Sequence, residues 1–81
     1  MRCFFLILIV GMSKDELIKL GMLIREKRES MSLTQVELAK RAGVDRNYIG
    51  MVERGERNPS YLSLQKIAVG LGIQVAELIK P

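Results

Sequence analysis

The chain has 81 residues, of which 48% are hydrophobic, with a formal net charge of +4, one cysteine and no histidine. This length supports one small domain, and the positive charge suits a polyanionic partner without requiring one. One cysteine and no histidine exclude an internal disulfide and a zinc site, and with no catalytic set in view we expect no enzyme, metal or cofactor.

Residues 1–12 form an apolar extension that admits two interpretations. The run CFFLILIV, Cys3–Val10, is too short to span a bilayer, which takes about 20 residues, and no small-residue cleavage site follows it. Either Met12 is the natural start, or the β-branched and aromatic run is a short β-strand. An exposed apolar strand aggregates unless it is paired, so the strand would need the same strand of a second subunit.

Residues 13–81 are expected to form one all-α domain that begins with a helix from about Lys14 to Ser30. Ser13 and Glu16 have the spacing of a capping box, in which each side chain bonds the backbone N–H of the other residue. Apolar or small residues then recur at the three-to-four spacing of one helix face: Leu17, Leu20, Gly21 and Ile24.

A second capping box opens the next helix. Thr34 and Glu37 have the same spacing as the first box and predict a helix over Gln35–Ala42. Gly43 can adopt the positive φ that ends a helix without strain. A tight turn is therefore expected directly after this helix.

The third helix is expected to run from Arg46 to Arg54, with Asp45 as its N-cap residue and Gly55 as its stop. Its apolar residues Ile49 and Val52 face back toward the second helix. Four other residues lie on the outward face, and most of them are polar or small: Arg46, Asn47, Gly50 and Met51. This pattern predicts a helix-turn-helix motif: two short helices joined by a tight turn, in which the second helix has outward side chains that are free to make contacts. In that motif the second helix enters the DNA major groove.

Two further helices are expected before the C-terminus. Ser60 caps a helix over Tyr61–Leu71, which Gly72 ends, and a last helical turn or two runs from about Val75 to Lys80. The C-terminal apolar residues exceed what one small core easily hides, which predicts an isologous dimer interface: Leu71, Ile73, Val75, Leu78 and Ile79. The alternative is that they complete the core of a single subunit. A dimer would place two recognition helices about 34 Å apart and read a palindrome.

The run LTQVELAKRAGVDRNYIGMVERGERNPSYLSLQKIA resembles the helix-turn-helix domain of phage lambda-type repressors, Cro and the XRE regulators. The resemblance covers residues from about 20 to 79. Within that superfamily, DRNYIGMVERGERNPS is most similar to the controller proteins of bacterial restriction–modification systems. The resemblance implies a five-helix lambda-repressor-like domain, in which the second and third helices read DNA and the last helices form a dimer surface.

The resemblance also implies roles for individual side chains. Arg46 and Asn47 would face base edges, because arginine pairs well with guanine and asparagine with adenine. Met51 would contact a thymine methyl group. The remaining candidates would contact the DNA backbone: Gln35, Tyr48, Arg57 and Asn58.

Glu53 is expected to have a structural role, whereas Ser32 and Gly70 depart from the pattern of the family. Glu53 would repel phosphate, so it should point away from DNA and pair with Arg25 or Arg28. Ser32 stands between the first two helices, where the family frequently has glycine. Gly70 occupies a helical position that is usually alanine, at a cost of up to about 1 kcal/mol.

The sequence therefore predicts a cytoplasmic homodimer that regulates transcription by binding double-stranded DNA at a palindromic operator, and the resemblance points to a restriction–modification controller protein. No metal and no membrane are expected as partners. The alternative function is an antitoxin-type or other protein-interaction module, for which DNA binding is secondary.

Overall fold

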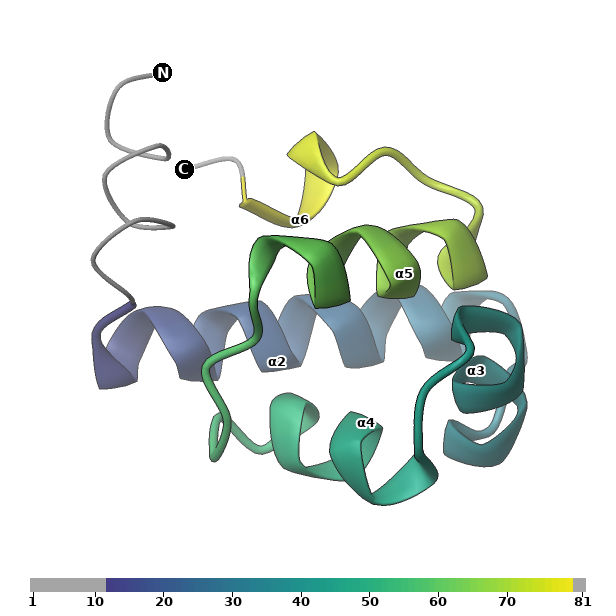
Figure 1. Ribbon diagram of the computed structural model, residues 1–81, viewed down its shortest axis with the longest axis horizontal. Coiled ribbons are helices and arrows are strands. Elements are labelled where there is room, and N and C mark those ends of the chain that lie inside the picture. The colour runs from purple at the N-terminus through teal and green to yellow at the C-terminus, as the bar shows by residue number, and fades with distance from the viewer. Residues whose placement is uncertain (1–11, 80–81) are drawn as a thin grey trace.

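The computed structural model describes residues 12–79, which form five α-helices and no strand (Figure 1). The helices are α2 (Lys14–Ser30), α3 (Gln35–Ala42), α4 (Arg46–Glu53), α5 (Tyr61–Leu71) and α6 (Ala76–Ile79). The all-α prediction is confirmed, and α4 ends one residue before the predicted Arg54. The predicted N-terminal strand, in residues 1–11, and the predicted helix end at Lys80 lie outside the described residues.

Side-chain caps start the helices at the predicted positions. Both capping boxes are complete: Ser13 accepts from the Glu16 backbone N–H, and Thr34 accepts from that of Glu37, each with the reciprocal bond. The returned bond from the backbone N–H of Ser13 or Thr34 holds the pKa of Glu16 and Glu37 below the ordinary value. These bonds satisfy donors that a helix N-terminus otherwise leaves unpaired.

All five helices contribute to one hydrophobic core. In Figure 1, α2 runs the length of the molecule, with α4 on one side of it, α5 and α6 on the other, and α3 at its end. The side chains that are fully buried come from the faces predicted to be apolar: Ile24, Leu38, Ile49, Val52, Leu64 and Ile67. Each such burial stabilises the fold by roughly 1.5–3 kcal/mol.

Two glycines let helices approach closely. A Cβ atom on Gly21 of α2 would lie 2.4 Å from the backbone oxygen of Glu53 in α4. On Gly70 of α5 it would lie 3.0 Å from Leu38 Cδ1 and 3.1 Å from the Ala42 nitrogen, both in α3. Beside the cost in helix stability expected from the sequence, Gly70 thus has a role in packing, because its missing side chain makes room for α3.

Ser32 adopts a left-handed backbone, with φ of 58°. It lies in the turn between α2 and α3, where Leu33 N–H donates to the Arg28 carbonyl. This conformation is strained for a residue with a Cβ atom. It gives a physical reason for glycine at this position in the family that the sequence resembles.

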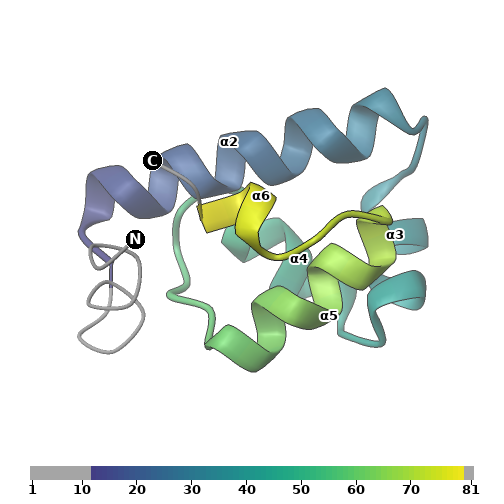
Figure 2. The ribbon, with the colours of Figure 1, turned by 90° about the horizontal axis from the view of Figure 1, so that it is seen from above.

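The C-terminal apolar residues divide between core and surface. Leu71 is 2% exposed and Leu78 is 3% exposed, because α6 folds back against α2 (Figure 2). The prediction that they form a dimer surface is corrected, since both complete the core of one subunit. Ile73, Val75 and Ile79 are half-buried against that core, and their place in a dimer interface stays a prediction.

Candidate nucleic-acid interface

The predicted helix-turn-helix is formed by α3 and α4. Gly43, with φ of 71°, ends α3, and the Val44 N–H donates to the Ala39 carbonyl to close the turn. Asp45 then caps α4 by accepting from the Asn47 backbone N–H at 3.1 Å. With Leu38 and Ile49 both fully buried between the helices, the opposite face of α4 is left to solvent.

An open depression of about 340 Å³ lies on that outward face. It is lined by one residue of α3, four of α4 and the residue after α4: Gln35, Arg46, Asn47, Gly50, Met51 and Arg54. All the residues predicted to face outward from α4 are among them. The structure therefore brings the three candidates for base contact, Arg46, Asn47 and Met51, together with Gln35.

Arg46 and Asn47 project from the first turn of α4, and both are exposed. Within residues 12–79, no carboxylate forms an ion pair with Arg46. Its guanidinium fork is thus available to a planar acceptor pair such as guanine O6 and N7. Met51 is half-buried and lines the same depression, so its thioether is available to an apolar partner.

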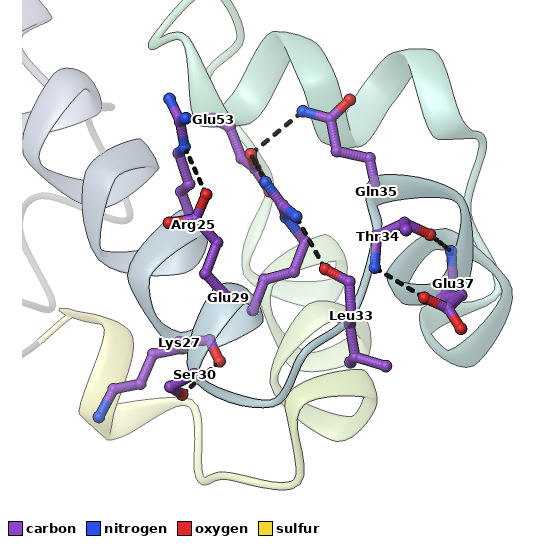
Figure 3. A network of polar contacts seen from close by, with 10 residues as sticks. Arg25, Lys27, Glu29, Ser30, Leu33, Thr34, Gln35, Glu37 and Glu53 are labelled. Carbon is purple, nitrogen blue, oxygen red and sulfur yellow. Dashed lines mark hydrogen bonds and ion pairs between the residues drawn. The ribbon is translucent and has the colours of Figure 1, made fainter.

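Gln35 is held in one orientation by a neighbouring carboxylate. Its Nε2 donates to Oε1 of Glu53 at 3.1 Å (Figure 3). A carboxylate only accepts, so the amide nitrogen must face Glu53 and the amide oxygen must face away. That oxygen lies beside Gly50, where an added Cβ atom would be 3.6 Å from it. The backbone contact expected of Gln35 stays a prediction.

Glu53 pairs with Arg28, one of the two arginines named in advance. Arg28 Nε donates to Glu53 Oε2 at 2.7 Å, and its Nη2 donates to Oε1 at 3.0 Å. Its Nη1 donates to the Leu33 carbonyl at 2.8 Å (Figure 3). The bond to Glu53 raises the pKa of Arg28. Arg25 instead pairs with Glu29 at 3.2 Å on the exposed side of α2.

This network joins three segments behind the depression. Arg28 comes from α2, Glu53 from α4, and Gln35 from the start of α3. Every buried side-chain polar atom of residues 12–79 has a hydrogen-bond partner. The network therefore fixes the recognition helix relative to the rest of the domain.

The other candidates for backbone contact lie outside the depression. The Arg57 guanidinium carbon is 5.5 Å from the centre of the Tyr48 ring, a cation–π distance. Tyr48 is half-buried against the core, and Asn58 is exposed in the loop after α4. Their contacts with DNA stay predictions.

Sequence reasoning missed Arg54. It lines the depression, at the position directly after α4. Its spacing was a usable signal, because Arg46, Gly50 and Arg54 recur every four residues and so share one helix face. Arg54 donates from Nε and Nη2 to the carboxylate of Glu56 at 2.9 and 3.1 Å. That contact raises the pKa of Arg54 and lowers the pKa of Glu56.

No group of three or more His, Cys, Asp or Glu residues within 12–79 is arranged to hold a metal ion. In the same range, no helix combines the length and apolar character needed to cross a membrane.

Comparison with known proteins agrees with this geometry. The helix-turn-helix family profile matches residues 24–78. The immunity repressor protein of Bacillus phage phi105 is 41% identical over 59 residues, which cover 73% of this chain and 41% of the repressor. The control protein C.MunI of Mycoplasma sp is 40% identical over 52 residues, covering 64% of this chain and 70% of that protein.

A solved structure shows the same arrangement of helices. The restriction–modification controller protein C.AhdI from Aeromonas hydrophila superposes with a TM-score of 0.78 and 44% sequence identity. The match covers 79% of this chain and 97% of that one. The chain thus spans less than half of the phage repressor but nearly the whole of a controller protein.

Proposed function

Given that this chain belongs to the helix-turn-helix family of DNA-binding transcription regulators, we propose that it acts as a homodimer on a palindromic operator. The observation that carries the proposal is the depression on α4, where the guanidinium fork of Arg46 and the amide of Asn47 face solvent together. Arginine and asparagine are the side chains best suited to read guanine and adenine in the major groove.

Reading and positioning divide between two sets of residues. Arg46, Asn47 and Met51 specify the operator, since base edges carry the sequence information. Gln35, Tyr48, Arg57 and Asn58 contact the backbone and set the register of the domain on the duplex. Because these phosphate contacts release counterions, affinity falls steeply as salt rises.

The similarity to controller proteins suggests the biological setting. C.AhdI has the same arrangement of helices at 44% sequence identity, and C.MunI is 40% identical to this chain over 52 residues. We therefore propose control of a restriction–modification system in the cytoplasm. A protein-interaction module with secondary DNA binding is the alternative, and co-purification with a protein encoded by a neighbouring gene would favour it.

A stripe on α5 supports the dimer. Leu62 is 63% exposed and Val69 is 72% exposed. They lie seven residues apart on one face of α5, and Ile73 follows the helix, after Gly72 ends it. In the proposed dimer, this stripe and the half-buried Ile73, Val75 and Ile79 meet their copies across a two-fold axis, so that the same patch serves both subunits.

The test begins with selection of an operator from random duplexes. Arg46→Ala should then lower affinity for that operator by about 1–3 kcal/mol and relax the choice at one base pair. Arg57→Ala should weaken operator and random duplex alike and flatten the salt dependence. Arg25→Ala, which removes an exposed arginine outside the depression, is the charge-matched control. Equal losses on operator and random duplex for Arg46→Ala would contradict base reading.

A further inference from the structure

The ion pair between Arg54 and Glu56 places a carboxylate at the edge of the DNA-facing depression. Gly55, with φ of 76°, separates the two residues in the turn that follows α4. The pair is bidentate, since Nε and Nη2 of Arg54 each donate to a different oxygen of Glu56. Both side chains are more than half exposed, at 58% and 54%.

The guanidinium of Arg54 has two sides with different surroundings. The side formed by Nε and Nη2 is taken up by Glu56. Nη1 lies beside Gly50, where an added Cβ atom would be 3.1 Å from it. Arg54 thus lines the depression while the edge best suited to a bidentate acceptor is already occupied.

A DNA phosphate offers that edge the same pair of acceptor oxygens as a carboxylate. Phosphate and Glu56 therefore compete for Arg54. An exposed ion pair adds little stability in water, so the exchange is easy. Breaking the Arg54–Glu56 pair nevertheless offsets part of what the new phosphate contact contributes to binding.

We propose that Glu56 limits DNA affinity by competing with DNA phosphate for Arg54, and that Arg54 exchanges Glu56 for a phosphate when the duplex binds. The competition lowers affinity for any sequence, because backbone contacts carry no sequence information. Base contacts from Arg46 and Asn47 then decide a larger share of the binding free energy. This inference rests on the proposed function, since it places Arg54 on the DNA-facing surface.

The experiment measures binding of the full chain to a random-sequence duplex at several salt concentrations. Glu56→Gln should tighten binding about threefold, the size expected for loss of an exposed ion pair, and steepen the salt slope by up to about 0.9. Glu29→Gln is the matched control, because it breaks the similarly exposed Arg25–Glu29 pair, which does not line the depression. It should leave both quantities near their wild-type values.

A second background separates competition for Arg54 from a general charge effect. In an Arg54→Gln protein, the further change Glu56→Gln should not tighten DNA binding, because Glu56 no longer has a guanidinium for which to compete with phosphate. A gain that persists in that background, or an equal gain from Glu29→Gln, overturns the proposal. The proposal also fails if Glu56→Gln leaves the affinity and the salt slope unchanged while the wild-type chain binds DNA. If the wild-type chain binds neither random duplex nor any selected operator, the proposed function fails instead.

Discussion

Glu53 carries a charge that the fold removes almost wholly from water. Its side chain is 3% exposed, and that of Arg28 is 11% exposed. Desolvating a carboxylate costs several kcal/mol, which a partner must offset through good geometry and further hydrogen bonds. Arg28 donates two bonds and Gln35 a third, so the charge is matched. The network orients α4 and Gln35 more than it adds net stability.

Removing one member of the Arg28–Glu53 ion pair should lower the free energy of unfolding far more than removing both. Arg28→Met leaves Glu53 buried without its cation and should lower the free energy of unfolding by about 3–5 kcal/mol, as should Glu53→Met. The double variant removes both charges and should lose much less than the sum. Urea unfolding followed by circular dichroism measures this, with the exposed Arg25→Met as a control that changes stability by at most about 1 kcal/mol. Additive losses would contradict the coupling.

At the scale of helices, glycine has a different role in each contact. Gly21 allows the backbone of α2 to touch the backbone of α4, whereas Gly50 faces the side-chain ends of Arg54 and Gln35. A backbone neighbour cannot move aside without moving a helix, but a side-chain end can rotate away. The cost of adding a methyl group should therefore depend on what the glycine faces.

Gly21→Ala should lower the free energy of unfolding by at least about 1–3 kcal/mol, because its methyl group would displace the Glu53 carbonyl. Gly50→Ala is the matched variant within another helix. It should keep or raise stability, since alanine is favoured over glycine in a helix by about 1 kcal/mol. Thermal unfolding of the two variants gives the comparison. Equal destabilisation would show that the close approach of α2 and α4 is not what Gly21 provides.

The capping boxes predict how α2 and α3 respond to acid. Glu16 and Glu37 have lowered pKa values in the folded chain, below the ordinary 4.5. A lowered folded pKa gives stability that is present above the unfolded value and is lost as pH falls toward the folded value. Stability should thus decline as the pH drops below about 4.5.

Glu16→Gln combined with Glu37→Gln should make this acid-side decline shallower. Glutamine can also complete a capping box but does not titrate. Urea unfolding at pH 7 and at several values below 4.5 compares the variant with the wild-type chain. As a control, Thr34→Ala should lose about 1 kcal/mol at pH 7, because it removes the cap itself. A variant that follows the wild-type pH dependence would refute this role for the two glutamates.

At the scale of the whole molecule, the buried set and the exposed set have separate roles. Leu71 and Leu78 are needed to complete the core of one subunit. Leu62 and Val69 are large apolar side chains that residues 12–79 leave exposed. The exposed pair can therefore test association without disturbing the fold.

Val69→Lys should weaken the proposed dimer by about tenfold or more, because two like charges would meet near the two-fold axis. Its thermal unfolding at low protein concentration should match that of the wild-type chain. Light scattering over a range of concentrations measures the association. Met22→Lys, at a residue of α2 that is 65% exposed, is the control and should leave the dimer intact. A dimer that is unaffected by Val69→Lys would place the interface elsewhere.

The sequence by itself determined the helices and most of the outward surface of α4. Ser13, Thr34 and Asp45 start helices through bonds to residues two or three positions away, and Gly43 ends one by its own φ. The outward set on α4 follows from helical spacing alone. These features depend on neighbours in the chain, so a single sequence is enough to read them.

Only the tertiary structure decided which residues meet across the chain. It selected Arg28 over Arg25 as the partner of Glu53, and it placed Leu71 and Leu78 in the core. It also showed that Gly70 makes room for α3. Each of these outcomes depends on how close two distant segments come after the helices pack. That distance is set by the shape of the whole core, which local spacing does not contain.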